Sequence, residues 1–411
     1  MNAKDLTFSK STLCGKVKVP PSKSLAHRAI ICAALAHGKS RIRGVQYSQD
    51  VSATLGVMRE MGAEAQEKDG CLEIEGTRGV CRDAEAFCNE SGSTLRMCLP
   101  VCAALNGGFT HFSGRGKLGQ RPMTVFEELW KDAGLYYRDD SAKKGALDLT
   151  VKGALPAGRY RVRGDVSSQF ISGLLFALPL ADGDSVVEIT TSLYSKGYID
   201  LTIQALGQAG VEVRFDGKER FEIKGGQKYL ATDGEIEGDW SQAAFYLVAN
   251  AIGSDVEILG LNEESAQGDR VIREYLEKLK NAGDLVFDCE DCPDVVPVFA
   301  VACALRKGRT RLTGLSRLKI KECDRLDAVY SQLSAIGADV RREGDDLVFD
   351  GVETFEGGVR VSSFNDHRIA MTLAIAATRC ERSITVDDFA CIAKSYPDFL
   401  DRYKELGGKV Q

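Results

Sequence analysis

Basic residues gather at the starts of apolar segments that the sequence predicts to be helices. Lys23 and Arg28 lie in or beside one such first turn, and Arg96 and Arg368 lie in two others. A cation in the first turn of a helix opposes the positive end of the helix dipole, which costs about 0.3–1 kcal/mol at an exposed site. The same arrangement becomes favourable around a multiply charged anion, because the cations and the helix ends both attract it.

Two further basic clusters, around Arg121 and over residues 319–325, stand at matching places of a repeated pattern. Solvated surface charge is the alternative explanation for any one cluster. Clusters at several equivalent positions favour instead a pocket for small, densely negative metabolites.

Four carboxylates stand among these cations, at Asp294, Glu322, Asp324 and Asp366. Asp324 and Asp366 are predicted to form salt bridges. Asp294 and Glu322 are the better candidates for proton transfer, because a carboxylate near its operating pKa serves as a base or as an acid.

Other residue patterns give weaker signals. His367, beside Arg368 at a helix start, is the one histidine that we place in the site, and the other three are expected to pack in the core or lie on the surface. The thirteen cysteines include a single C-x-x-C pair, Cys289 and Cys292, with no second pair or nearby histidine to complete a zinc site. We therefore expect reduced thiols and no metal. The sequence also lacks a G-x-x-x-x-G-K-[ST] loop and a G-x-S-x-G turn, so neither nucleotide hydrolysis nor serine-hydrolase chemistry is indicated.

The basic helix starts belong to a pattern that recurs six times along the chain. Each copy opens with a turn and a β-branched strand, continues with an amphipathic helical stretch, and reaches a glycine that suits the left-handed position after a helix. An alternating strand follows most of these glycines, as over 211–214 and 338–341, which is typical of a half-buried sheet. The six glycines are Gly62, Gly134, Gly210, Gly283, Gly337 and Gly407.

Each copy also contains a second helix that is apolar nearly all round, and such a helix has to be surrounded by protein. Six copies give two lobes of three, each of the α/β class with a buried helical layer. We place one lobe over 21–236 and form the other from 1–20 with 237–411. The strand over 13–19 is expected to complete the sixth copy. The buried helices are predicted over 24–36, 93–105, 168–180, 241–252, 295–305 and 369–378.

The composition of the whole chain is that of an ordinary globular protein. Of its 411 residues, 44% are hydrophobic and 27% are charged, which excludes disordered and fibrous classes and allows two domains. The net charge of −6 argues against nucleic acid or an anionic membrane as the main partner. No apolar stretch is long enough to cross a bilayer, and residues 1–5 lack the apolar region of an export signal, so we expect a cytoplasmic protein.

On these motifs the chain resembles the 5-enolpyruvylshikimate-3-phosphate synthase family over essentially its whole length. Any one motif is weak, but nine in the right order are highly specific. The family fold has two similar lobes that close on substrate, and each lobe is an inside-out α/β barrel of three βαβαββ units around buried helices. The motifs are Pro21-Ser22-Lys23-Ser24 with Arg28, Ser91-Gly92-Ser93-Thr94-Leu95-Arg96, Gln120-Arg121-Pro122, Val166-Ser167-Ser168-Gln169-Phe170, Ser195-Lys196-Gly197-Tyr198-Ile199-Asp200, Pro293-Asp294, Lys321-Glu322-Cys323-Asp324-Arg325-Leu326, Asn365-Asp366-His367-Arg368 and Lys394-Ser395-Tyr396-Pro397-Asp398.

The resemblance implies transfer of the enolpyruvyl group of phosphoenolpyruvate to the 5-hydroxyl of shikimate 3-phosphate, with release of phosphate, on the route to aromatic amino acids. It implies a monomer that needs no metal or organic cofactor. Asp294 is the implied base for the hydroxyl, and Glu322 is the implied group for proton exchange at C3, with Lys23 assisting.

The resemblance also implies the substrate contacts, with Arg96 and His367 as supporting residues. The implied contacts of shikimate 3-phosphate are Lys23, Ser24, Arg28, Ser167, Ser168, Gln169, Ser195, Tyr198, Asp294, Arg317 and Lys321. The implied contacts of phosphoenolpyruvate are Lys23, Gly92, Arg121, Gln169, Arg325, Arg368 and Lys394.

Three positions differ from the commoner family pattern: Glu90 and Arg317 stand where Asn is usual, and Pro21 replaces a usual Gly. Gly92, which lacks a methyl group, is expected to leave room for glyphosate in the phosphoenolpyruvate pocket.

Two other functions stay open from the sequence. One is the enolpyruvyl transferase that acts on UDP-N-acetylglucosamine, whose pattern begins with Lys-Asn where this chain has Lys23 and Ser24, and which usually carries a loop Cys absent from 115–121. The other is a non-catalytic module that binds phosphometabolites, which the presence of both Asp294 and Glu322 disfavours.

Overall fold

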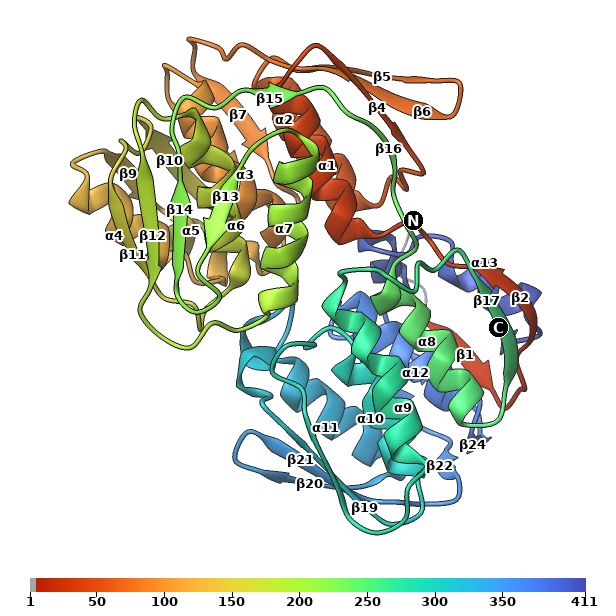
Figure 1. Ribbon diagram of the computed structural model, residues 1–411. Coiled ribbons are helices and arrows are strands. Elements are labelled where there is room, and N and C mark those ends of the chain that lie inside the picture. Colours follow the sequence, from red (N-terminus) through yellow and green to blue (C-terminus); the bar gives the residue numbers. More distant parts are fainter. Residues whose placement is uncertain (1–4) are drawn as a thin grey trace. The chain divides into compact units, whose positions relative to one another are not determined.

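The computed structural model describes residues 5–411, and these form two compact units (Figure 1). One unit comprises residues 21–237, and the other combines residues 5–20 with 238–411. Both units consist of helices and mixed sheets, so the predicted α/β class is confirmed.

Five four-stranded sheets in the described chain share one pairing pattern. In each sheet the first two strands are parallel, and the next two pairings are antiparallel. This common pattern is the structural form of the repeat seen in the sequence. The 21–237 unit contains β16-β4-β6-β5 (Asp233–Glu235, Lys39–Arg43, Cys71–Glu75, Glu64–Lys68), β7-β8-β10-β9 (Ala84–Phe87, Thr110–Ser113, Asp148–Lys152, Tyr136–Asp139) and β11-β12-β14-β13 (Arg159–Val162, Ser185–Ile189, Arg220–Ile223, Val213–Phe215). The other unit contains β18-β19-β21-β20 (Leu285–Asp288, Arg309–Thr313, Asp346–Asp350, Asp339–Glu343) and β23-β25-β1-β26 (Arg360–Val361, Ile384–Val386, Leu6–Ser9, Lys409–Val410).

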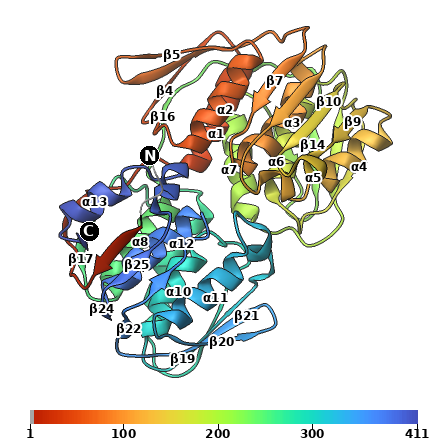
Figure 2. The ribbon, with the colours of Figure 1, turned by 180° about the vertical axis from the view of Figure 1, so that it is seen from behind.

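The predicted buried helices are present within a few residues of their expected bounds. Every residue of α12 is buried, and α8, α10 and α12 pack on one another in their unit, as both views show (Figures 1 and 2). In the other unit α3 and α6 form the most extensive helix pair. The helical layer therefore lies inside each unit, as the lack of a polar face predicts. These helices are α1 (Lys23–Leu35), α3 (Gly92–Leu105), α6 (Ser168–Ala177), α8 (Trp240–Ala251), α10 (Val296–Leu305) and α12 (His367–Ala377), with a 3-10 turn over Leu178–Leu180 continuing α6.

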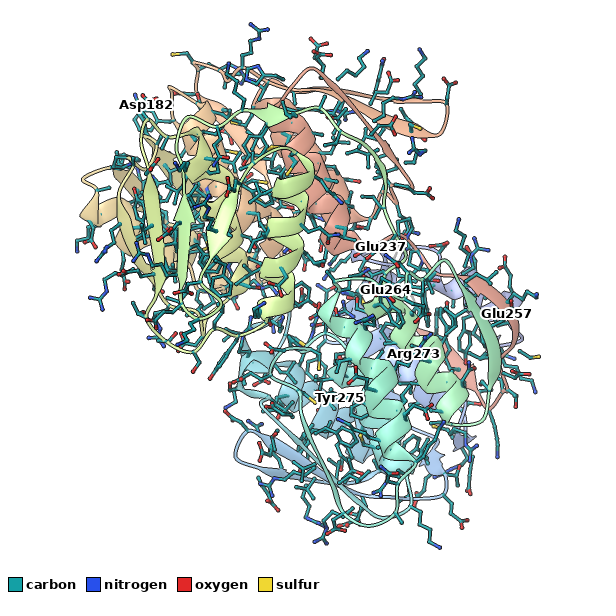
Figure 3. The ribbon with its side chains drawn as sticks, viewed as in Figure 1. Asp182, Glu237, Glu257, Glu264, Arg273 and Tyr275 are labelled. Atoms are coloured by element: carbon teal, nitrogen blue, oxygen red, sulfur yellow. The ribbon has the colours of Figure 1, made fainter. Side chains whose placement is uncertain are left out.

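The amphipathic helices pack their apolar sides on this layer. Helix α9 is an example, and Figure 3 labels two of its residues, Arg273 and Tyr275. The Arg273 guanidinium lies 5.0 Å from the centre of the Trp240 ring, and the Tyr275 ring lies 5.4 Å from the Phe299 ring. The six predicted glycines after these helices all have φ between 66° and 106°, which confirms the left-handed position. Five of these helices end two residues before their glycine, whereas α9 ends at Leu279, four residues before Gly283. The helices are α2 (Gln49–Glu60), α4 (Thr124–Asp132), α7 (Lys196–Gln208), α9 (Ile272–Leu279), α11 (Arg325–Ala335) and α13 (Phe399–Glu405), and α5 (Ser141–Lys144) adds one turn.

The expectation for the strand over 13–19 is wrong. This segment forms β2 (Cys14–Lys18), which runs parallel to β17 (Asp255–Leu259) in the fourth copy. Lys16 of β2 lies 2.8 Å from Glu257 of β17, which Figure 3 labels. The sixth copy is completed instead by β1, which lies antiparallel between β25 and β26. The reason is burial: β2 is mostly exposed, whereas Phe8 of β1 is fully buried and packs 4.9 Å from the ring of Phe389.

The chain passes from one unit to the other twice, at residues 20–21 and 237–238, and we call these two points the crossings. At each crossing, the strand that precedes the next buried helix pairs within the copy on the other side of the crossing from that helix. In four copies the strand before a buried helix pairs with the strand after it. At the crossings, β2 precedes α1 yet pairs with β17, and β16 precedes α8 yet pairs with β4. Each crossing therefore leads directly into a buried helix, and Lys23 follows the first one by two residues. Two short parallel pairs complete the sheets: β15 (Tyr229–Leu230) with β3 (Ala36–His37), and β22 (Phe355–Gly357) with β24 (Cys380–Arg382).

Candidate active site

Lys23 is the first residue of α1, after the N-cap Ser22. Its Nζ lies 2.8 Å from Oδ2 of Asp50 at the start of α2, and the two side chains are 16% and 9% exposed. The cation predicted at this helix start is thus largely buried and ion-paired. Asp50 was not predicted, because in the sequence it is an ordinary acid in a helix first turn.

Arg28 joins the starts of α1 and α7. Its guanidinium donates to the backbone oxygens of Ser24 and Tyr198, both at 2.6 Å, and from Nε to Thr202 Oγ1 at 2.9 Å. Burial lowers the pKa of Arg28 to about 10. Ser195, the residue before α7, has the left-handed φ of 55°. Four predicted residues therefore come together here: Ser24, Arg28, Ser195 and Tyr198.

Gly92, the first residue of α3, lies beneath two side chains. A Cβ atom at this position would lie 2.3 Å from Nη1 of Arg121 and 3.6 Å from Oε1 of Gln169. Gln169 donates from Nε2 to Ser93 Oγ at 2.8 Å and accepts from Arg96 Nη1 at 3.2 Å. The structure thus brings together Gly92, Arg121 and Gln169, with Arg96 beside them.

Two more predicted residues begin α6. Ser167 is the N-cap and accepts the N–H of Gln169 at 3.3 Å, and Ser168 is the first helical residue. Both serines are buried. They therefore flank Gln169 at the same helix start.

Replacement of Gly92 by alanine is expected to weaken the binding of an anionic substrate and raise its KM about tenfold, because the methyl group would displace the guanidinium of Arg121. Gly92 does not have a positive φ, so the backbone of α3 can hold alanine without strain and the fold is expected to stay intact. Steady-state kinetics and thermal unfolding of Gly92→Ala test the two expectations. Gly56→Ala, at an open position on α2, is the control. An unchanged KM would contradict the prediction.

In the other unit, Asp294 lies just before α10 and contacts three cations. Its Oδ1 lies 2.9 Å from Arg325 Nη1 and 3.4 Å from Lys321 Nζ, and its Oδ2 lies 3.0 Å from Arg368 Nη2. Burial on its own would raise the pKa of Asp294, but the charges of Arg368, Lys321 and Arg325 outweigh burial and hold this pKa well below its usual value. Asp294 is therefore ionised at neutral pH.

Arg325, the first residue of α11, is a buried cation among three carboxylates. Its side chain is 1% exposed and lies 2.6 Å from Glu322, 2.7 Å from Asp366 and 2.9 Å from Asp294. Burial opposes the charge, but Asp366, Glu322 and Asp294 outweigh it and raise the pKa of Arg325 well above its usual value. The predicted salt bridge of Asp366 is confirmed.

Asp324 has a role different from the predicted salt bridge. It is the N-cap of α11, where its carboxylate accepts the N–H of Asp327 at 3.0 Å. Its position directly before the helix explains this role, since carboxylates are favoured N-caps.

The remaining predicted residues of this unit lie around the same helix starts. Burial lowers the pKa of Lys321 to about 8, with Asp294 opposing the shift and Arg317 adding to it. Lys394 is buried and donates to the backbone oxygen of Asn365 at 2.6 Å, just before α12. His367, the first residue of α12, is also buried.

Ser241 in α8 is a further residue that sequence reasoning did not place in the site. Its hydroxyl accepts from Arg368 Nη2 at 2.9 Å and donates to the N-cap Asp239 at 2.6 Å. The signal for it was present, since Ser241 follows Asp239 at one of the six helix starts.

The C-x-x-C pair is part of the core. Cys289 and Cys292 are buried thiols, each 1% exposed, and all thirteen cysteines are reduced. The hydrogen bond with Cys289, together with burial, raises the pKa of Cys292 well above its usual value. Among residues 5–411, no three His, Cys, Asp or Glu side chains are grouped as a metal site would need.

In both units, buried cations and carboxylates lie at the N-terminal ends of helices. This arrangement is typical of α/β proteins that bind multiply charged anions. The family model of EPSP synthase (3-phosphoshikimate 1-carboxyvinyltransferase) matches residues 9–403, and the chain belongs to that family. The resemblance predicted from the motifs is confirmed.

Relatives and solved structures agree with this family. The chain is 47% identical to the 3-phosphoshikimate 1-carboxyvinyltransferase of Clostridium botulinum (strain Eklund 17B / Type B), with 96% of each chain covered, and 43% identical to that of Clostridioides difficile (strain 630), with 98% of each covered. Its fold is similar to that of EPSP synthase from Acinetobacter baumannii, with a TM-score of 0.80, 23% identity and 99% of each chain covered. It is also similar to that of the enolpyruvyl transferase NikO from Streptomyces tendae, with a TM-score of 0.76, 15% identity, and 100% of this chain and 98% of NikO covered.

The helices of the described chain are short compared with the thickness of a bilayer. Within residues 5–411, none is long and apolar enough to span a membrane.

Proposed function

We propose that the protein transfers the enolpyruvyl group of phosphoenolpyruvate to the 5-hydroxyl of shikimate 3-phosphate and releases phosphate. Family membership and the names of the relatives support this reaction. The structural observation that carries it is the ionised Asp294 among Arg325, Arg368 and Lys321. Substrates that bear two phosphates and two carboxylates repel each other unless cations lie between them, and a base is needed at the attacking hydroxyl.

The proposed contacts of the two substrates are those that the family resemblance implies. For shikimate 3-phosphate these are Lys23, Ser24, Arg28, Ser167, Ser168, Gln169, Ser195 and Tyr198 from the 21–237 unit, with Asp294, Arg317 and Lys321 from the other. For phosphoenolpyruvate they are Lys23, Gly92, Arg121 and Gln169, with Arg325, Arg368 and Lys394. Arg96, which contacts Gln169, and His367 support these sets.

Binding of the substrates is proposed to activate Asp294. Without substrate, its low pKa makes the carboxylate a weak base, because three cations stabilise the ionised form. Phosphate and carboxylate groups that bind these cations would weaken their hold on Asp294 and raise its pKa toward the value that proton transfer needs.

The reaction then proceeds by addition and elimination. The 5-hydroxyl oxygen attacks C2 of phosphoenolpyruvate and gives its proton to Asp294, while C3 gains a proton from Glu322 with Lys23 assisting. The Glu322 carboxylate then takes a proton back from C3 of the tetrahedral intermediate, the electrons of that C–H bond restore the double bond between C2 and C3, and the C2–O bond to phosphate breaks. Glu322 lies 2.6 Å from Arg325, one of the proposed contacts of phosphoenolpyruvate, and this supports its place in the proposed site.

Phosphate release with two alternative acceptors tests the proposal. We expect release from phosphoenolpyruvate with shikimate 3-phosphate and none with UDP-N-acetylglucosamine. Release only with the nucleotide sugar would identify the other enolpyruvyl transferase. Binding of shikimate 3-phosphate without release in either assay would identify a non-catalytic module.

The affinity for shikimate 3-phosphate is expected to fall as the pH rises through about 8, because an anion binds the protonated form of Lys321 and the pKa of Lys321 is lowered to about 8. The phosphate itself titrates near pH 6, so it changes charge mainly below about pH 7, and the fall through about pH 8 is not due to the phosphate. Titration calorimetry between pH 6.5 and 9.5 measures the effect. Lys321→Arg keeps its charge and should flatten the profile. An unchanged profile in that variant would contradict the assignment.

A further inference from the structure

Asp50 is a buried acid whose carboxylate is directed at a catalytic candidate. It is the second residue of α2, and its Oδ2 lies 2.8 Å from Lys23 Nζ. A buried carboxylate needs an ionic or hydrogen-bonding partner. Lys23 needs a partner as well, because it stands in the first turn of α1, where the helix dipole disfavours a cation.

Stability of α2 alone is the simplest explanation for an acid at this place, since a helix dipole favours a carboxylate in the first turn. However, α2 is already capped by Ser48, whose Oγ accepts the N–H of Val51 at 3.3 Å. The Asp50 carboxylate accepts a hydrogen bond from Lys23, the first residue of the neighbouring helix α1. Helix capping therefore does not account for its direction or its burial.

A hydrogen-bonded chain through three helices fixes the backbone around Asp50. Thr94 Oγ1 of α3 donates to the backbone oxygen of Asp50 at 3.3 Å and lies 2.8 Å from Thr54 Oγ1 of α2. Thr54 Oγ1 lies 2.7 Å from Nδ1 of His27 on α1. All four residues are buried. A side chain held by such a supporting network has little freedom to move.

We propose that Asp50 is a positioning residue, which holds the Lys23 ammonium in the orientation that enolpyruvyl transfer needs; this inference rests on the proposed function. Lysine carries its charge on a flexible four-carbon chain with three rotatable N–H donors. A carboxylate that fixes the direction of one N–H also fixes the other two. Without it, Lys23 keeps its charge but loses its orientation, so turnover suffers more than substrate binding.

Asp50→Asn is the direct test, because asparagine keeps the size of the side chain and removes its charge. We expect kcat to fall about 10- to 100-fold, with the KM of each substrate changed less than about threefold. Asp50→Glu restores the carboxylate and should recover part of kcat. Asp233→Asn, which breaks the exposed ion pair with Arg43 in the same unit, is the matched control and should leave kcat unchanged.

Two outcomes would overturn the inference. One is an unchanged kcat for folded Asp50→Asn enzyme, or for Asp50→Ser, which also lacks the carboxylate, if the Asn variant does not fold. The other concerns the thermal midpoint, which Asp50→Asn should lower in the wild-type background, where Lys23 loses its partner, and should not lower in a Lys23→Met background. An equal fall in both backgrounds would show that Asp50 acts independently of Lys23. Failure of the wild-type protein to release phosphate would refute the proposed function instead, and the stability cycle would still test the coupling of Asp50 to Lys23.

Discussion

Replacement of Lys23 by methionine is expected to lower the kcat of phosphate release by at least about 10³-fold. Methionine matches the length and apolar stem of lysine but carries no charge. The variant therefore removes a cation that is proposed to meet both substrates at the start of α1, where negative charge moves as phosphate departs. Such a preorganised charge in a largely buried place cannot be replaced by water.

The fold is expected to survive this change. Loss of Lys23 leaves the Asp50 carboxylate without its partner at 2.8 Å, so the thermal midpoint should fall, by no more than about 5 °C in a chain of this size. Lys39→Met, at an exposed lysine of the same unit, is the control. Circular dichroism and phosphate release on the same samples separate unfolding from loss of activity. A Lys23→Met enzyme that retained a tenth of the wild-type kcat would contradict the catalytic role.

Replacement of Asp294 by asparagine is expected to lower kcat by about 10²- to 10⁴-fold and to change the KM of shikimate 3-phosphate much less. Asparagine keeps the shape and can still accept hydrogen bonds from Arg325 and Arg368, but it cannot take a proton from the 5-hydroxyl. The variant therefore separates general-base catalysis from binding.

Stability is the second readout for Asp294→Asn. The carboxylate balances three cations, so its removal should lower the thermal midpoint, although its side chain is 22% exposed and solvent screens part of the loss. Asp346→Asn, at a partly exposed acid paired with Arg311, is the control in the same unit. If Asp294→Asn raised KM and left kcat unchanged, Asp294 would be a binding residue only.

The local elements of the fold follow from short-range patterns. The six buried helices were predictable because an apolar face that covers the whole circumference leaves a helix no solvent-exposed position. The glycines after the amphipathic helices were predictable because only glycine adopts the left-handed conformation without strain. Cations at helix starts likewise predicted where buried charge lies, as Lys23 and Arg325 show.

The pairing of distant segments was decided only in the tertiary structure. Leu6 and Val386 are adjacent in one sheet although 380 positions separate them in the chain, and the expected place of 13–19 in that sheet was wrong. The tertiary structure also decided which charged side chains pair. Asp50 pairs with Lys23, and three carboxylates surround Arg325. Periodicity along a sequence reports which face of an element is buried, but the atoms that cover that face come from elsewhere in the chain. The amino-acid sequence by itself therefore determined the elements, the repeat and the charges, and the packing of those elements decided which charges meet.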